Sequence, residues 1–386
     1  MTGRPAARTR CPACHGGDLT QFFETRDVPV HCNILSPDAA AAAAAPLGDI
    51  LLAFCRSCGL IFNQLFDEAL TAYSESYENS LYFSPAFQEY ADWLADHLVE
   101  AFNLHDKDLV EVGCGSAEFL NALCERGDNR GFGFDPSAPP SRFPRVTIVP
   151  EFYGPDHAGH PADAVLSRHV LEHVADPAAL LTDLRAAVTP GVAFYCEVPN
   201  ARFVLGDLSV WDIIYEHPSY FAEEPLRFVT SAAGFAVTDS FTGFGDQFLA
   251  VEALAGDTPT ARTPDPGDLP DLVAEFATAY EEKFRHWEHR LAQWTSTGAR
   301  IALWGAGSKG VSFLNMVPGA DDINMVVDIT PRKHGKHIPG SAQPVVGPED
   351  LAAQPPETVL VMNPVYRDEI ASILTGLGID ATVEVV

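Results

Sequence analysis

The chain has 386 residues, a formal net charge of −29 and a hydrophobic content of 47%, which allows more than one domain with a substantial core. Such an acidic chain is a poor candidate for binding nucleic acid through phosphates, because that binding needs clustered lysine and arginine. No apolar run approaches the length of a membrane-spanning helix, and the N-terminus lacks the apolar stretch of a secretory signal. We therefore expect a cytoplasmic protein without nucleic-acid or membrane partners.

Two Cys-x-x-Cys pairs mark residues 1–70. Cys11 and Cys14 form the first pair, and Cys55 and Cys58 form the second. Each pair can make a tight turn that directs two thiolates at one point, so two pairs predict a tetrahedral zinc site. Four thiolates leave no open coordination position, which makes the predicted zinc structural. Disulfides are the alternative, and a cytoplasmic location disfavours them.

Aromatic side chains crowd the segment between Tyr73 and Phe102, which ends in an amphipathic helix. Tyr77 and Tyr82 belong to this segment and are candidates for binding the substrate, because they offer stacking surfaces and hydroxyl donors. Packing of a linker helix on the core is the alternative.

A glycine turn follows an apolar, strand-like run that ends at Glu111, and a second predicted strand ends at Asp135. Gly113 and Gly115 would let a ligand approach the backbone closely, and a carboxylate at Asp135 suits a ribose diol. A dinucleotide fold requires a third glycine where Glu118 stands. Glu111 would repel a pyrophosphate but could face a cationic amino acid group, so the pattern indicates a nucleoside cofactor that carries such a group.

The stretch from Glu111 to Gly115 resembles motif I of the class I S-adenosylmethionine-dependent methyltransferases, and later elements follow in the order of that family. Residues 163–166 predict the fourth strand, after which Arg168 and His169 are expected to line the junction between cofactor and methyl acceptor. A helix and a fifth strand over 192–199 come next. The resemblance implies S-adenosylmethionine as the cofactor. For motif I alone, a glycine turn in an unrelated α/β protein is the alternative.

Acid–base groups gather just beyond the fifth strand, where a methyl acceptor would lie. Tyr215, Glu216 and His217 are consecutive, and Asn200 and Tyr220 stand on either side as candidates for binding the acceptor. An imidazole titrates near neutral pH and can take a proton from an acceptor, while a tyrosine hydroxyl could polarise a carbonyl. We predict a catalytic role for His217, with a structural histidine as the alternative.

A Pro- and Asp-rich linker opens the segment 257–386, and a strand, a glycine loop and a helix follow. Gly305, Gly307 and Gly310 match a dinucleotide-binding pattern, with Asp328 after the next strand. The segment is short for an oxidoreductase, which favours a Rossmann-like domain that binds the substrate. Lys309, at the start of the helix, could meet a phosphate.

The order of these parts resembles the sugar C-methyltransferases of deoxysugar biosynthesis. The resemblance implies a zinc module over 1–70, a methyltransferase domain over 71–256 and a substrate-side domain over 257–386. It also implies a nucleotide-linked keto-sugar as the acceptor and His217 as the base, which removes a proton beside the ketone with support from Tyr215 and Glu216. The enolate carbon would then attack the sulfonium methyl.

The glycine loop at Gly305 and the proline after His217 depart from that family's pattern, so the acceptor is less firmly predicted than the architecture. An O- or N-methyltransferase that acts on another small metabolite is one alternative. A NAD-binding oxidoreductase or regulatory protein that uses the Gly305 loop is another. The predicted fold is α/β: a Rossmann-like class I methyltransferase domain between an N-terminal zinc-binding module and a C-terminal Rossmann-like domain.

Overall fold

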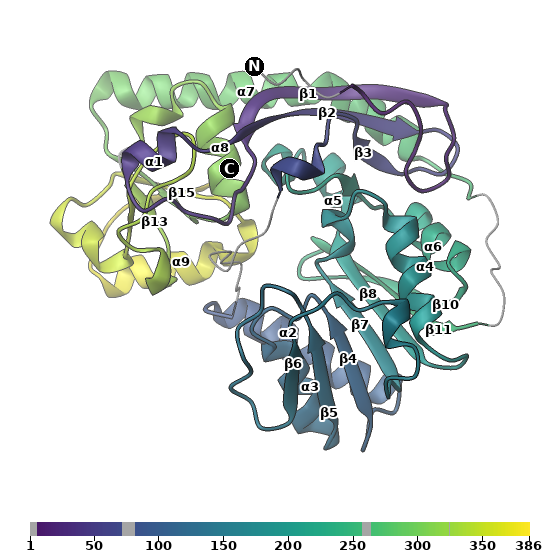
Figure 1. Ribbon diagram of the computed structural model, residues 1–386. Coiled ribbons are helices and arrows are strands. Elements are labelled where there is room, and N and C mark those ends of the chain that lie inside the picture. Colours follow the sequence, from purple (N-terminus) through teal and green to yellow (C-terminus); the bar gives the residue numbers. More distant parts are fainter. Residues whose placement is uncertain (1–5, 72–81, 257–263, 324) are drawn as a thin grey trace.

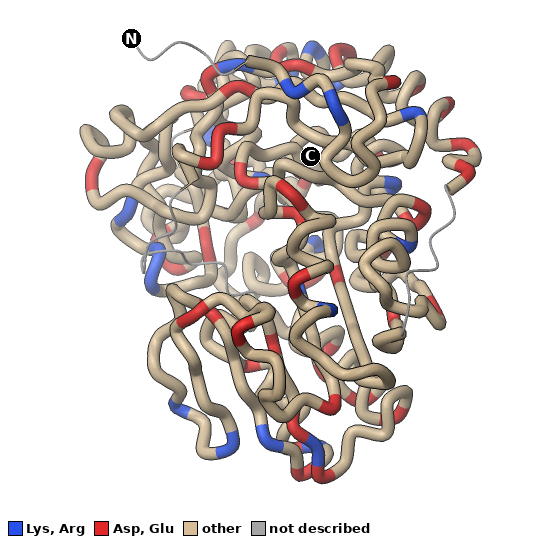
Figure 2. Tube along the Cα trace, turned by 45° about the vertical axis from the view of Figure 1, so that its right-hand side comes forward, with Lys and Arg blue, Asp and Glu red and all other residues tan. Residues whose placement is uncertain are grey.

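The computed structural model describes residues 6–71, 82–256, 264–323 and 325–386, which form three sheets with surrounding helices (Figure 1). The first sheet lies across the top of this view, the second below it and the third at the left. Acidic residues are spread over the described parts of the chain (Figure 2), in keeping with the net charge of −29. Among the helices of the described residues, none is both long enough and apolar enough to cross a membrane.

The first sheet is antiparallel, with strand order β1-β2-β3-β9. Its strands are β1 (Leu19–Pro29), β2 (Leu47–Cys55), β3 (Ile61–Asn63) and β9 (Ser219–Tyr220). The alanine run before β2 forms the short helix α1 (Ala39–Ala43), which Asp38 caps by accepting a hydrogen bond from the Ala41 amide. Because β9 comes from the middle of the sequence, this sheet ties the N-terminal module to a segment that the sequence places far away.

The second sheet has strand order β10-β11-β8-β7-β4-β5-β6. Its strands are β4 (Asp108–Val112), β5 (Arg130–Phe134), β6 (Val146–Val149), β7 (Ala164–Arg168), β8 (Ala193–Pro199), β10 (Phe235–Gly243) and β11 (Phe248–Ala255). Strands β4 to β8 are parallel, and β10 and β11 are antiparallel. The chain proceeds from β4 to one side and then returns to the other, so β4 ends at the switch point where such sheets bind ligands.

The helices of the middle segment are α2 (Pro85–Ala101), α3 (Glu118–Gly127), α4 (Pro177–Ala187), α5 (Ala201–Gly206) and α6 (Glu223–Ala232). Helix α2 begins where the Ser84 hydroxyl accepts a hydrogen bond from the Phe87 amide, with Pro85 as the first helical residue. Its buried residues Phe87, Tyr90 and Leu94 recur at helical spacing and form one apolar face.

The third sheet is parallel, with order β14-β13-β12-β15-β16. Its strands are β12 (Ile301–Trp304), β13 (Met325–Val327), β14 (Val345–Val346), β15 (Thr358–Val361) and β16 (Thr382–Val385), and its helices are α7 (Leu269–Thr297), α8 (Ser308–Met316) and α9 (Arg367–Gly376). Helix α7 also packs on β1, where Phe276 meets the rings of Phe22 and Phe23 at 5.9 and 6.1 Å between centroids.

These sheets confirm the predicted α/β architecture with a Rossmann-like central domain. The expected fourth and fifth strands at 163–166 and 192–199 correspond to β7 and β8. Buried side chains of the N-terminal strands, of residues 201–222 and of the C-terminal domain share one continuous hydrophobic core. The acid–base segment predicted around His217 therefore lies between elements of all three parts.

Candidate active site

The glycine turn after β4 has the backbone that the motif requires. Gly113 and Gly115 have φ values of 69° and 51°, in the left-handed region that favours glycine. A Cβ atom at Gly113 would come within 2.3 Å of Val170 Cγ2, whereas one at Gly115 would meet nothing within 4 Å. Gly113 therefore serves close packing inside the turn, and Gly115 borders open space that a ligand can enter.

Asp135 is held at the same end of the sheet. Its Oδ2 accepts a hydrogen bond from the Gly115 amide at 3.0 Å, and its Oδ1 accepts from the amide and the hydroxyl of Ser137, each at 2.8 Å. A carboxylate has about four lone-pair sites, so one remains for a ligand hydroxyl. The structure thus brings together three of the predicted cofactor residues.

Glu111 is a buried carboxyl group beside this turn. Its Oε2 has no hydrogen-bond partner among the described residues, and only 4% of the residue is exposed. Burial raises its pKa to about 8, against the attraction of Arg168 and with a further contribution from Glu118. The carboxyl group is therefore mostly protonated at pH 7, and a cationic ligand group would restore its charge.

Tyr82 lies near residues predicted to bind the cofactor, although the sequence analysis grouped it with the candidates for binding the substrate. Its hydroxyl is buried without a hydrogen-bond partner among the described residues, and burial raises its pKa. The charges that act on this hydroxyl belong to Arg168, Glu111 and Glu118. Tyr77, its predicted companion, lies outside the described residues.

A buried ionic network at the ends of β7 and β8 centres on Glu197, which the sequence analysis missed. Its Oε1 accepts two hydrogen bonds from Arg168, at 3.0 and 2.9 Å, and its Oε2 accepts from Tyr195 at 2.9 Å and from Tyr90. Burial opposes ionisation of Glu197, but Arg168 and His169 outweigh it and hold the pKa of Glu197 well below its usual range. The sequence signal that could have identified this residue was a glutamate within an otherwise apolar strand.

His169 stands between two carboxylates. Its Nε2 lies 3.1 Å from Glu197, and its Nδ1 lies 3.5 Å from Glu172, another residue that the sequence did not single out. Burial alone would lower the pKa of His169, but these two contacts raise it to about 9. The His169 ring also meets Phe248 edge-on at 4.5 Å between centroids. Arg168 and His169 thus supply positive charge beside the cofactor turn.

His217 has the environment of a neutral imidazole. Its half-buried ring lies 4.6 Å from that of His173, and its Nδ1 is buried without a hydrogen-bond partner among the described residues. Burial lowers its pKa well below the usual value, with further lowering by the charges of His173, His169 and Lys309. The imidazole is therefore neutral at pH 7.

The two predicted helpers of His217 point elsewhere. The Tyr215 hydroxyl accepts a hydrogen bond from the Asp67 amide at 2.8 Å, and the Glu216 carboxylate accepts one from the Cys32 amide at 2.7 Å. Both partners belong to the N-terminal module. The structure does not bring these two side chains into contact with the His217 ring.

The predicted acceptor contacts are also bonded within the protein. Tyr220 donates to and accepts from the backbone of Ile214 through its hydroxyl, at 3.1 and 3.0 Å. Asn200 caps α5 and donates to the Asp246 carbonyl. Lys309 pairs with the Asp212 carboxylate. The structure therefore places these residues around the segment of His217, with their polar groups occupied.

The four cysteines predicted to bind metal converge. Cys11 and Cys58 have their Sγ atoms 3.5 Å apart, as do Cys14 and Cys55, and all four atoms lie within 4.8 Å of one another. A disulfide requires about 2.05 Å, whereas a tetrahedral zinc site with bonds of about 2.3 Å spaces its sulfurs about 3.8 Å apart. The donor set and spacing fit zinc.

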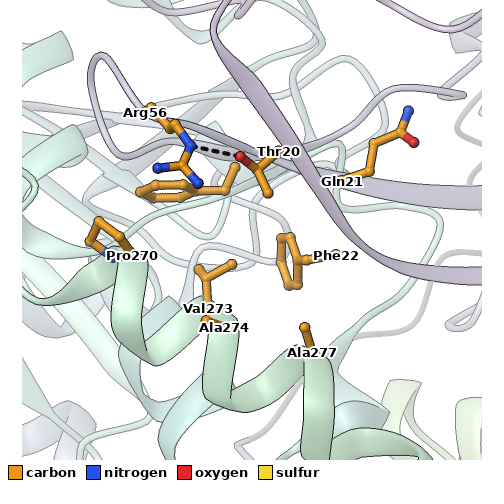
Figure 3. A pocket seen from close by; sticks show the side chains of 9 residues that line it. Thr20, Gln21, Phe22, Arg56, Pro270, Val273, Ala274 and Ala277 are labelled. Carbon is orange, nitrogen blue, oxygen red and sulfur yellow. Dashed lines mark hydrogen bonds between the residues drawn. The ribbon is translucent and has the colours of Figure 1, made fainter.

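Asp328, the acidic residue beside the Gly305 loop, accepts several hydrogen bonds within the protein. Asp328 accepts hydrogen bonds from the amides of Ala306 at 2.9 Å and Thr330 at 2.8 Å, and from Lys333 at 3.0 Å. As at Asp135, three accepted hydrogen bonds leave one lone-pair site on this carboxylate. A separate pocket of about 240 Å³ between the first sheet and α7 (Figure 3) contains none of the predicted site residues.

Two family models match the chain, a methyltransferase domain over residues 82–240 and a C-methyltransferase C-terminal domain over residues 268–378. The chain is a class I S-adenosylmethionine-dependent methyltransferase. The first match contains motif I and the segment of His217, and the second contains the Gly305 loop. The predicted enzyme class is confirmed, in preference to the NAD-binding alternative.

This methyltransferase has a relative of similar length, the C-methyltransferase NovU of Streptomyces niveus, which is 26% identical over 385 residues. The match covers 93% of this chain and 90% of the relative. The tRNA U34 carboxymethyltransferase of Nautilia profundicola is 26% identical over 125 residues, which cover 29% of this chain and 40% of that protein.

Among solved structures, the 1,6-didemethyltoxoflavin-N1-methyltransferase of Burkholderia thailandensis, with bound S-adenosylhomocysteine, aligns to this methyltransferase with a TM-score of 0.36. Its sequence identity is 18%, over 45% of this chain and 82% of that chain.

Proposed function

We propose that this methyltransferase adds a methyl group to a carbon atom of a small metabolite, with His217 as the base. The observation that carries the proposal is the neutral imidazole of His217 beyond the carboxyl ends of the cofactor strands, whose Nδ1 has no hydrogen-bond partner among the described residues. Proton removal from carbon requires such a base, whereas many oxygen or nitrogen acceptors do not. The match of residues 268–378 to a C-methyltransferase domain supports the same acceptor atom.

The acceptor that we propose is a nucleotide-linked keto-deoxysugar. The support is the three-part order of the chain, which resembles the sugar C-methyltransferases, together with a relative over 93% of the chain that is named a C-methyltransferase. A ketone acidifies the neighbouring carbon, so a single imidazole is a sufficient base there.

The cofactor would be held by the turn after β4. The open side of Gly115 would admit it, Asp135 would accept a ribose hydroxyl, and Glu111 would face its ammonium group. When bound, S-adenosylmethionine supplies an electrophilic methyl group. His217 would take the acceptor proton, and the protein would contribute further by holding the acceptor carbon in line with the methyl group of S-adenosylmethionine.

We also propose a structural zinc ion at Cys11, Cys14, Cys55 and Cys58, because the four thiol groups converge at a tetrahedral spacing. This site would fix the turn before β1 and the turn between β2 and β3 rather than take part in the reaction.

The test is to incubate the protein with methyl-carbon-13 S-adenosylmethionine and a nucleotide-linked keto-deoxysugar, and to locate the label by NMR. A labelled methyl group attached to a ring carbon next to the ketone supports the proposal. A label on oxygen or nitrogen would reject carbon as the acceptor, and the absence of any methylated sugar would reject this acceptor class.

A further inference from the structure

The segment that carries His217 is fastened to the N-terminal module on both sides. Before His217, the Glu216 carboxylate accepts a hydrogen bond from the Cys32 amide at 2.7 Å and lies 3.4 Å from His31 Nδ1. The Tyr215 ring packs so closely on Gly48 that a Cβ atom there would come within 2.3 Å of it.

After His217, the backbone itself is joined to the module. The Asn63 amide donates to the Pro218 carbonyl at 2.9 Å. Strand β3 then pairs with β9, with Phe62 opposite Ser219 and Ile61 opposite Tyr220. The same short strand follows Cys58 in the sequence, and the Cys55 amide donates to the Leu60 carbonyl at 2.8 Å. A continuous set of backbone bonds therefore runs from the cysteine turn to the residues after His217.

These contacts are buried and specific. Glu216 is 1% exposed and Ser219 is 1% exposed, so water does not replace a bond that is lost there. Within the middle segment, the amide of His217 is held by the Ile214 carbonyl at 3.2 Å. The module thus supplies much of the restraint on the backbone of His217.

We propose that the N-terminal module is the frame that positions His217, and that Glu216 is a positioning residue within that frame. This inference rests on the proposed role of His217 as the base. Glu216 affects the reaction by holding the backbone of His217 in place, because its carboxylate is directed at Cys32 and His31 and not at the acceptor. A base displaced by about 1 Å can slow a reaction by about 10²-fold, so the frame is a requirement for turnover.

The experiment compares Glu216→Ala, Glu216→Gln and His217→Asn in the full-length, zinc-loaded protein. Glu216→Gln keeps an oxygen that can accept from the Cys32 amide, whereas Glu216→Ala removes it. We expect Glu216→Ala to lower kcat by about 10²-fold with unchanged affinity for S-adenosylmethionine, and Glu216→Gln to retain kcat within a few-fold. Hydrogen–deuterium exchange should rise over residues 213–221 in Glu216→Ala and stay unchanged over residues 108–135.

His217→Asn is the matched control, because it should abolish proton removal while leaving exchange over residues 213–221 as in the wild type. Equal losses of kcat in Glu216→Gln and Glu216→Ala would overturn the inference in favour of a role for the charge. So would wild-type kcat or wild-type exchange in Glu216→Ala. If Glu216→Ala does not fold, Tyr215→Phe, which removes the acceptor of the Asp67 amide, provides the same exchange readout. Full activity of His217→Asn would instead reject the proposed function.

Discussion

The imidazole rings of His173 and His217 meet edge to face, with 4.6 Å between their centroids and 82° between their planes. His173 follows β7 and has Nδ1 2.9 Å from the Glu216 carbonyl, which makes that nitrogen the donor because a carbonyl only accepts. Two segments far apart in the sequence therefore form one acid–base group at the end of the sheet. Burial holds the pKa of His217 well below its usual value, and the neighbouring imidazole of His173 lowers it further.

The two glycines of the motif should respond differently to alanine. Gly113→Ala places a Cβ atom 2.3 Å from Val170, so it should lower the thermal unfolding temperature. Gly115→Ala adds its methyl group to open space and costs about 1–2 kcal/mol of backbone strain, while narrowing the entry to the cofactor site. Calorimetric titration should show weaker S-adenosylmethionine binding by folded Gly115→Ala. Unchanged affinity in that variant would remove Gly115 from the cofactor site.

Cofactor binding should release a proton from Glu111. Burial raises its pKa to about 8, so it is mostly protonated at pH 7, and a neighbouring ammonium group should lower that pKa. Affinity should therefore rise with pH up to about 8. Calorimetric titration at pH 7 in two buffers of different ionisation enthalpy measures how many protons are released when the cofactor binds. We expect close to one released in the wild type and none in Glu111→Gln; equal release in both proteins would contradict this role.

Glu197 should contribute strongly to the stability of the fold. Glu197→Ala leaves Arg168 buried without its carboxylate partner, and breaking a buried pair costs about 3–5 kcal/mol. Urea denaturation should show this decrease in the free energy of unfolding. Arg285→Ala is the matched control, since its partner Glu282 is exposed and the pair is worth about 0–1 kcal/mol. Similar small losses in both variants would show that the network around Glu197 adds little.

Zinc removal should loosen the segment of His217 as well as the module. Protein purified without chelator should contain close to one zinc ion per chain, and Cys14→Ser should contain less. Because β3 follows Cys58 and pairs with β9, hydrogen–deuterium exchange over residues 219–221 should rise when zinc is removed. Ala39→Ser, on α1 outside the cysteine cluster, should leave both measurements unchanged. Zinc-free wild-type protein with oxidised thiols would exclude the metal site.

The local parts of this site could be predicted from the sequence because strand, turn and helix are adjacent in it. The sequence predicted that the turn with Gly113 and Gly115 would lie close to the carboxylate of Asp135. In the structure the Gly115 amide donates a hydrogen bond to that carboxylate. Glu197 was missed because its partners Arg168 and Tyr90 come from other elements, and only packing brings them together.

Adjacency in sequence did not predict where the side chains that precede His217 point. Tyr215 and Glu216 were expected to support it because they precede it directly. Consecutive side chains of a non-helical segment point in different directions, however, and these two reach Asp67 and Cys32 in the N-terminal module. Lys309 likewise meets Asp212, a carboxylate that the order of predicted elements did not place near it.

The most direct test of the role of His217 is exchange of the acceptor proton with solvent. A nucleotide-linked keto-deoxysugar is incubated in deuterium oxide with the protein and S-adenosylhomocysteine, which cannot donate a methyl group, and deuterium at the carbon beside the ketone is followed by NMR. The account predicts rapid exchange with the wild type and none above the uncatalysed rate with His217→Asn. Equal exchange with both proteins would contradict it.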